Sequence, residues 1–262
     1  MDVKNKKLFL LDMDGTIYID KTLFDGTLLF LEQVKKAGGR YMFLTNNSSK
    51  SVSTYVEKLK GLGIEAEESD FLTSVNATIT HLKSKSYQKI YAFGTTSFKS
   101  QLADAGLAVT ERLEEGIDCL CMGFDTELTF QKLEDACVLL GKEVDYIATN
   151  PDWVCPTSYG YVPDCGSVSE MLFRATGRRP HFIGKPAPDM ALAAMQQAGF
   201  DAHETVLIGD RLYTDIACGI NAGIDTIFVL SGEGTEEDLQ TSDVTPTYVC
   251  KSILSVYESM IS

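Results

Sequence analysis

Short apolar runs alternate with amphipathic segments along most of this chain, and this alternation restricts its fold more than any other feature. Apolar runs of strand length lie at 8–11, 41–44, 182–183, 206–208 and 226–230. Runs that are apolar throughout are typical of strands in a parallel sheet with helices on both faces. A helical segment from Pro188 to Gly199 follows one of these runs, with proline at its start and glycine at its end. Strand and helix in alternation predict an α/β fold with a doubly wound parallel sheet.

The middle of the chain, between about 80 and 180, repeats this pattern. Strand-like runs lie at 90–93, 119–122 and 146–148, with helical segments near 98–105, 129–141 and 167–176. These elements could extend the first sheet, or they could form a second α/β unit inserted into it. Periodicity alone does not decide between the two arrangements.

Composition excludes several classes of partner. The chain of 262 residues carries a formal charge of −14 at pH 7, which argues against nucleic-acid binding and against docking on anionic membranes. No run approaches the roughly 20 apolar residues of a membrane span, and the N-terminal residues do not resemble a secretory signal. The seven cysteines form an odd set without a C-x-x-C spacing, so we expect a reducing, cytoplasmic location.

Two carboxylates follow the first apolar run directly. Asp12 and Asp14 are spaced i, i+2 after residues 8–11, at a strand end where open α/β sheets bind ligands. Gly15 allows the chain to turn there and can bring backbone N–H groups close to an anion. Taken alone, the segment also fits a polar strand end followed by an ordinary turn.

Polar residues follow two further apolar runs. Thr45 and Asn46 come after residues 41–44 and can donate hydrogen bonds to phosphate oxygens, although both residue types also cap helices. Lys185 comes shortly after residues 182–183 and could supply a positive charge to an anion. Each of these signals is weak by itself, because a lone lysine usually lies on the surface.

The fourth segment is again acidic. Asp210 and Asp215 follow residues 206–208, close to the start of a predicted helix, where an acid is also stabilised without any function. Because the C-terminal ends of parallel strands share one edge of a sheet, we expect the polar residues of all four segments to converge: Asp12, Asp14, Thr45, Lys185, Asp210 and Asp215. Clustered carboxylates repel one another unless a cation lies between them. Hard oxygen ligands without histidine or cysteine select Mg²⁺.

In this order, the four segments resemble the four motifs of the haloacid dehalogenase superfamily of phosphohydrolases. They are most similar to its NagD-like, 4-nitrophenylphosphatase branch, through Asp12-x-Asp14-Gly15-Thr16 with Ile17-Tyr18 after it, Thr45-Asn46-Asn47-Ser48, Gly184-Lys185-Pro186 and Gly209-Asp210-x4-Asp215. That branch carries a large α/β cap between its second and third motifs. The resemblance therefore implies a core domain at 1–79 and 181–262, with an inserted α/β cap domain at 80–180.

The resemblance also implies an activity and a metal. The enzyme would be a Mg²⁺-dependent phosphatase acting on small phosphomonoesters, such as nucleotide monophosphates, sugar phosphates and 4-nitrophenyl phosphate, through an aspartyl-phosphate. Asp12 would be the nucleophile, and Asp14 the general acid and base. Asp12, Asp210 and the backbone carbonyl of Asp14 would hold Mg²⁺. Asp215 would complete the metal site by orienting Lys185 or a water molecule.

Substrate binding is implied in the same way. Gly15, Thr45, Asn46 and Lys185 would hold the phosphoryl group, with Thr45 and Lys185 also taking part in catalysis by stabilising charge. The cap would cover the site and select the leaving group. Trp153, the only tryptophan, is interpreted as a core residue of the cap, with a place in the substrate pocket as the alternative. The partner would be a small molecule, and the chain could form a homo-oligomer.

Two other functions share parts of this pattern. Response-regulator receiver domains also combine acids, threonine and lysine on a doubly wound sheet, but their paired acids adjoin and their phosphoacceptor lies on a later strand. A phosphomutase of the same superfamily would keep phosphate on its substrate. Release of phosphate from 4-nitrophenyl phosphate over many turnovers would distinguish a phosphatase from both.

Overall fold

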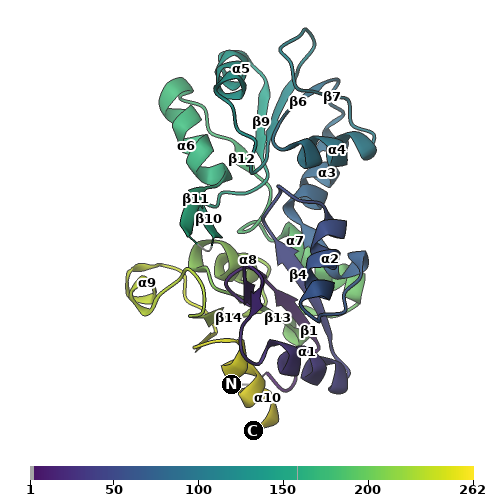
Figure 1. The fold of residues 1–262 in the computed structure, drawn as a ribbon, viewed down its shortest axis with the longest axis vertical. Coiled ribbons are helices and arrows are strands. Elements are labelled where there is room, and N and C mark those ends of the chain that lie inside the picture. The colour runs from purple at the N-terminus through teal and green to yellow at the C-terminus, as the bar shows by residue number, and fades with distance from the viewer. Residues whose placement is uncertain (1–2, 158) are drawn as a thin grey trace.

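The computed structural model describes residues 3–157 and 159–262. Two sheets of parallel strands lie one above the other along the long axis of the molecule (Figure 1). Segments from both ends of the chain build the lower half, and the middle of the chain builds the upper half (Figure 1).

The first sheet has six strands in the order β15-β14-β13-β1-β4-β5, all parallel. Its strands are β1 Leu8–Leu11, β4 Arg40–Thr45, β5 Phe71–Thr73, β13 Thr205–Gly209, β14 Asp225–Val229 and β15 Tyr248–Cys250. The strands predicted around 8–11, 41–44, 206–208 and 226–230 are confirmed, apart from their end residues. Because β1 pairs with β4 on one side and β13 on the other, the strand order reverses at β1, where such sheets bind ligands.

The second sheet has five strands in the order β12-β9-β8-β6-β7. Its strands are β6 Ile90–Phe93, β7 Val109–Thr110, β8 Cys119–Met122, β9 Asp145–Ala148 and β12 His181–Phe182. The middle of the chain therefore forms a separate α/β unit. Since β12 pairs with β9, the prediction that residues 182–183 belong to the first sheet is wrong. A two-residue apolar run carries no information about which sheet it will join.

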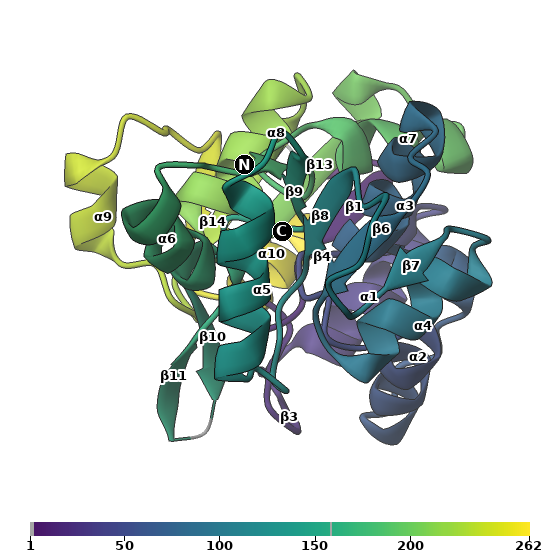
Figure 2. The same ribbon diagram turned by 90° about the horizontal axis from the view of Figure 1, so that it is seen from above.

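Helices cover the sheets, as two perpendicular views show (Figures 1 and 2). The α-helices are α1 Thr27–Lys36, α2 Val52–Gly61, α3 Ser74–Lys85, α4 Thr96–Asp104, α5 Phe130–Leu140, α6 Cys165–Thr176, α7 Asp189–Ala198, α8 Ala217–Asn221, α9 Glu236–Thr241 and α10 Ile253–Ile261. The helix expected between Pro188 and Gly199 is α7. Among residues 3–157 and 159–262, no helix combines the length and apolar character needed to cross a membrane.

Short elements complete the described chain. Antiparallel hairpins are formed by β2 Tyr18–Ile19 with β3 Thr22–Leu23, and by β10 Val154–Thr157 with β11 Gly160–Pro163. Single turns of other helix types lie at η1 Glu68–Asp70, η2 Ala202–Glu204 and η3 Leu212–Ile216, of which η3 is a π-helix. The β10–β11 hairpin lies at the height where the two halves of the molecule meet (Figure 1).

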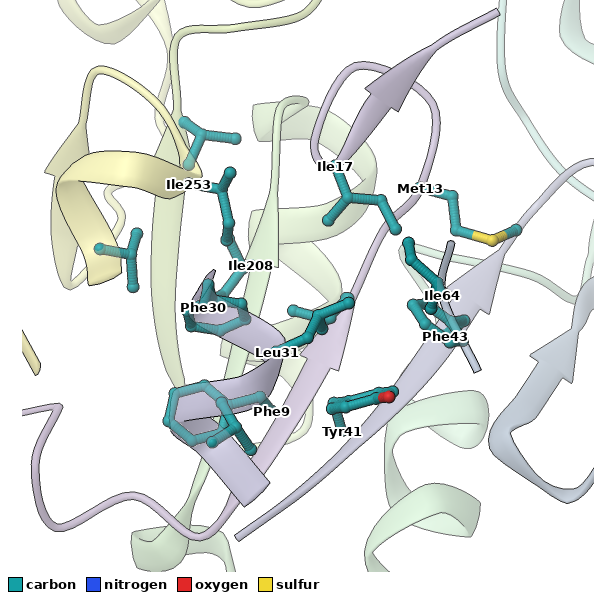
Figure 3. Packing of buried hydrophobic residues seen from close by; sticks show 14 of the residues in the cluster. Phe9, Met13, Ile17, Phe30, Leu31, Tyr41, Phe43, Ile64, Ile208 and Ile253 are labelled. Atoms are coloured by element: carbon teal, nitrogen blue, oxygen red, sulfur yellow. The ribbon is translucent and has the colours of Figure 1, made fainter. Parts of the chain in front are cut away.

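Alternate residues of β1 enter different hydrophobic cores, as expected of a strand buried on both faces. Phe9 packs edge-on against Phe30 of α1, with ring centroids 5.4 Å apart, in the cluster shown in Figure 3. Leu8 and Leu10 point to the opposite face and pack with Met190 of α7. Each large apolar side chain buried in this way stabilises the fold by about 1.5–3 kcal/mol. Hydrophobic side chains therefore pack against both faces of β1, the strand that directly precedes Asp12.

Candidate active site

Lys185 connects two of the predicted acidic residues. Its Nζ lies 2.6 Å from Asp12 Oδ1 and 2.6 Å from Asp215 Oδ1, and it also donates to the carbonyl oxygen of Leu44 at 3.0 Å. The Lys185 side chain is only 2% exposed. The backbone N–H of Asp12 donates to Ile208 at 2.9 Å, which ties the end of β1 to β13. Lys185 of the third motif therefore contacts residues at the ends of β1 and β4 through its buried ammonium group.

The predicted carboxylates converge. Oxygens of Asp12, Asp210 and Asp215 all lie within 4.8 Å of one another. The turn of η3 returns the chain toward β13, and the backbone N–H of Arg211 donates to Asp215 Oδ2 at 3.0 Å. Gly209 lies so close that a Cβ there would overlap the Asp215 side chain. The spacing of the fourth motif thus places both of its acids on one edge.

A loop after β14 surrounds Asp210. The backbone N–H of Glu233 donates to Asp210 Oδ2 at 2.7 Å, and the Thr16 hydroxyl donates to Oδ1 at 3.3 Å. A Cβ on Gly232 would overlap the Asp210 carboxylate. This loop was not assigned to the site from the sequence. Its closely spaced glycines, Gly232 and Gly234, were the available signal.

Gly15 makes the turn that the sequence predicts, but its own N–H is not free for an anion. Its φ is +91°, and a Cβ would overlap the Asp210 carboxylate, so the position favours glycine for both reasons. The Gly15 N–H donates to the carbonyl oxygen of Tyr18 at 2.8 Å. It is therefore already used within the turn rather than directed at an anion.

Burial makes the acidic cluster costly without a cation. It raises the pKa of Asp210 to about 7, with the charge of Asp215 acting in the same direction. It also raises the pKa of Asp12 well above its ordinary value, although Lys185 opposes the shift. Burial alone would lower the pKa of Lys185, but Asp12 and Asp215 outweigh it, so the lysine pKa is raised and the group stays an ammonium.

The charges and donor atoms of the cluster fit a divalent cation. When all are ionised, Asp12, Asp210 and Asp215 exceed the charge of Lys185 by two negative units. The clustered donors are carboxylate oxygens, without histidine or cysteine. Hard oxygen ligands of this kind suit Mg²⁺.

Asp14 lies apart from this cluster. The Tyr18 hydroxyl donates to its Oδ2 at 3.2 Å, and Lys58 Nζ lies 3.5 Å from its Oδ1. Burial raises the pKa of Tyr18 far above its ordinary value, and the charge of Asp14 adds to the effect, so the phenol keeps its proton. The carboxylate of Asp14 is thus not part of the Asp12, Asp210 and Asp215 cluster, although it lines the same pocket as Asp12.

Asn46 and Thr45 differ in how they contribute. The Asn46 side chain accepts from the Lys185 N–H at 2.9 Å and donates to the Lys185 carbonyl at 3.0 Å and to Asp152 Oδ2 at 2.7 Å. Both ends of this amide are therefore occupied in positioning Lys185. The Thr45 hydroxyl oxygen accepts from the Asn47 N–H at 3.2 Å and lines the pocket beside Asp12.

Comparison with known proteins decides the family. A family model described as haloacid dehalogenase-like hydrolase matches residues 9–108, and a second, HAD-hydrolase-like model matches residues 182–256. An acid sugar phosphatase of Staphylococcus aureus is 34% identical over 252 residues, which cover 96% of each chain. The chain belongs to the haloacid dehalogenase-like hydrolases. The two matched stretches contain the four motifs, and the stretch between them carries β7, β8 and β9.

Solved structures agree with this assignment. A 4-nitrophenylphosphatase from Thermotoga maritima has a TM-score of 0.91 at 39% identity, covering 98% of both chains. A glycerol phosphate phosphatase from Mycobacterium tuberculosis, solved with magnesium, has a TM-score of 0.88 at 29% identity, covering 97% of this chain and 77% of that one. The resemblance to the NagD-like, 4-nitrophenylphosphatase branch is confirmed, as is a core with an inserted α/β cap. This haloacid dehalogenase-like hydrolase is a phosphatase.

The hydrolase has a small pocket at its acidic cluster and a large cleft beside it. Asp12, Thr45 and Lys185 line the pocket, which has a volume of about 30 Å³, enough to hold a water molecule. The cleft has a volume of about 1,030 Å³, enough for a sizeable ligand. Asp14, Asn47, Cys155 and Pro156 line both spaces. The two spaces therefore adjoin along these residues, Asp14 among them.

A second buried ionic group joins the segment before β10 to the first sheet. Arg211 Nη1 lies 2.5 Å from Asp152 Oδ1, and its Nε lies 2.7 Å from Glu233 Oε2. Asn150 donates to Asp152 Oδ2 at 2.7 Å and to Asp164 Oδ1 at 3.1 Å. Sequence reasoning missed this group, because Arg211 and Asp152 are 59 residues apart and neither spacing nor periodicity pairs them.

Trp153 is 49% exposed, so its interpretation as a core residue of the cap is wrong. Its side chain lines a surface groove with Pro151, Arg179 and Tyr213. That groove shares none of its lining with the pocket at Asp12. Trp153 directly precedes β10. Its neighbour Asp152 is buried, whereas the Trp153 side chain is exposed.

Proposed function

We propose that this hydrolase is a Mg²⁺-dependent phosphatase that cleaves small phosphomonoesters through an aspartyl-phosphate on Asp12. The contact of Lys185 with both Asp12 and Asp215 at 2.6 Å carries the proposal, because it places a fixed positive charge beside the proposed nucleophile. Nucleotide monophosphates, sugar phosphates and 4-nitrophenyl phosphate are the proposed substrates. The names of the similar phosphatases support this class.

The first step transfers the phosphoryl group to the protein. Lys185 and the Thr45 hydroxyl hold the phosphoryl oxygens while a carboxylate oxygen of Asp12 attacks phosphorus. The bond from phosphorus to the leaving-group oxygen breaks, and Asp14 gives that oxygen its proton. The products are an alcohol or phenol and the phosphorylated Asp12.

The second step restores the enzyme. Asp14, now a carboxylate, takes a proton from water as the water oxygen attacks phosphorus. The bond between phosphorus and Asp12 breaks, and inorganic phosphate leaves. Mg²⁺ held by Asp12, Asp210, the backbone carbonyl of Asp14 and Asp215 would neutralise charge on the phosphoryl oxygens.

We further propose that residues 80–180, whose sheet is completed by β12, act as a cap over a core formed by 1–79 and the rest of the chain after β12. Asp152 and Asp164 of this segment line the pocket beside Asp12, so movement of the cap would open the pocket for substrate entry. The leaving group would occupy the cleft that adjoins the pocket at Asp14. The acidic charge supports a small-molecule partner rather than nucleic acid or membrane, and the seven free thiols support a cytoplasmic location.

The test is release of phosphate from a panel of phosphomonoesters over many turnovers, with Mg²⁺ and with EDTA. Asp12→Asn should lower turnover by orders of magnitude without changing the thermal unfolding midpoint by more than a few degrees. The exposed Asp104→Asn is the matched control. Near-normal turnover by Asp12→Asn would refute the assignment of Asp12 as the nucleophile. Phosphate retained on the substrate would indicate a phosphomutase, and release limited to one equivalent would indicate a phosphoacceptor domain.

A further inference from the structure

Tyr18, which follows the first motif, and Lys58, which lies outside the four motifs, hold the carboxylate of Asp14. The Tyr18 hydroxyl donates to Asp14 Oδ2 at 3.2 Å, and Lys58 Nζ lies 3.5 Å from Asp14 Oδ1. Lys58 Nζ also lies 3.7 Å from the centre of the Tyr18 ring, which is within cation–π distance. The three side chains therefore contact one another in pairs, and each oxygen of Asp14 has its own partner.

Tyr18 and Lys58 both belong to elements that pack against the main hydrophobic cluster. Tyr18 begins β2 and is fully buried. Lys58 lies on α2, whose buried residues Tyr55 and Leu59 pack into the main hydrophobic cluster. The Lys58 side chain is 22% exposed, so most of its stem is buried while its ammonium reaches Asp14. Packing of this kind limits the orientations that the Asp14 carboxylate can adopt.

The two contacts also lie on a defined side of Asp14. Lys58 lines the large cleft together with Asp14 but does not line the small pocket beside Asp12. Lys58 and Tyr18 together form a clamp on Asp14, and this clamp borders the space assigned to the leaving group through Lys58. A general acid must lie within hydrogen-bond reach of the leaving-group oxygen in the reacting complex.

We propose that Lys58 and Tyr18 are positioning residues that hold the Asp14 carboxyl at the boundary between the phosphate pocket and the leaving-group cleft. The inference rests on the proposed general-acid role of Asp14. A misplaced acid transfers its proton less effectively, and small displacements of catalytic groups cost large factors in rate. The loss should be greatest for a leaving group that departs poorly without a proton.

Lys58→Met and Tyr18→Phe test the proposal, because one removes the charge and the other only a hydroxyl. Both should lower kcat/KM for an alkyl phosphate by about tenfold more than for 4-nitrophenyl phosphate, whose phenolate leaves without protonation. The control is Lys60→Met, on the same helix but exposed, which should affect neither substrate. Two variants on separate elements keep the test valid if one of them folds poorly.

Coupling to Asp14 completes the experiment. In an Asp14→Asn background, Lys58→Met should cause no further selective loss, since the group it positions is gone. Equal losses on both substrates, or an increase in KM alone, would overturn the clamp and indicate a structural or substrate-binding lysine. If Asp14→Asn is selective while Lys58→Met and Tyr18→Phe are not, only the clamp fails. If Asp14→Asn itself shows no selectivity, the general-acid assignment fails with it.

Discussion

The side-chain amide of Asn46 donates to Asp152 Oδ2 at 2.7 Å, although the two residues are 106 positions apart. The same amide contacts the backbone N–H and carbonyl of Lys185, and Asp152 also pairs with Arg211. Polar contacts thus run without interruption from the segment before β10 to Lys185 and the fourth motif. Removing these contacts should lower both the free energy of unfolding and the rate of turnover.

Asn46→Ala should lower kcat/KM by about tenfold or more, because the backbone of Lys185 loses its support beside Asp12. It should also lower the free energy of unfolding by about 1–3 kcal/mol, since buried polar groups at Asp152 and Lys185 lose a partner. Steady-state kinetics and urea unfolding measure the two effects. Exposed Gln88→Ala is the control, and an Asn46→Ala variant equal to it in both assays would contradict the prediction.

Asp164 should make stability depend on pH. Burial raises its pKa from 3.8 to about 7, and the charge of Asp152 acts in the same direction. The folded protein therefore holds a proton there that the unfolded chain has released. The stability from this proton is complete below pH 3.8 and is lost as the pH rises through about 7.

Asp164→Asn removes this dependence while keeping an oxygen that can accept from the Asn150 amide. Relative to wild type, the variant should gain on the order of 1–4 kcal/mol in free energy of unfolding between about pH 4 and pH 8. Urea unfolding across this range, in EDTA, measures the difference. Parallel curves for wild type and variant, with Asp104→Asn as control, would show that Asp164 does not titrate as described.

Mg²⁺ should stabilise the folded protein by binding the carboxylates of Asp12, Asp210 and Asp215. At about 100 times its Kd, a ligand specific for the folded state adds about 2.7 kcal/mol to the free energy of unfolding. We therefore expect the wild-type Tm to rise with Mg²⁺ and the rise to disappear in Asp210→Asn. Exposed Asp243→Asn should keep it. Salt at matched ionic strength controls for screening, and an undiminished shift in Asp210→Asn would place the metal elsewhere.

Local pattern was enough to find most of the first sheet and the acids at its edge. The four apolar residues of β1 are buried on both faces, and a strand of that kind ends where Asp12 begins. Short edge strands were missed: β5 and β15 have three residues each, too few to show a period. The prediction that β12 joins the first sheet failed for the same reason.

Some features of the site follow from the sequence alone, and others follow only from the tertiary structure. Sequence by itself determined which residue types follow each strand, and parallel pairing then brings Asp12, Thr45 and Asp210 to one edge, because all three strands run in the same direction. Only the tertiary structure decided the partners of Asp14, the contact of Asn46 with Asp152 and the exposure of Trp153. The partners of Asp14 depend on how β2 and α2 pack beside β1, whereas the contact of Asn46 with Asp152 depends on how the two sheets approach each other. Periodicity describes one helix or strand at a time, so it does not predict which side chains of different elements will contact each other.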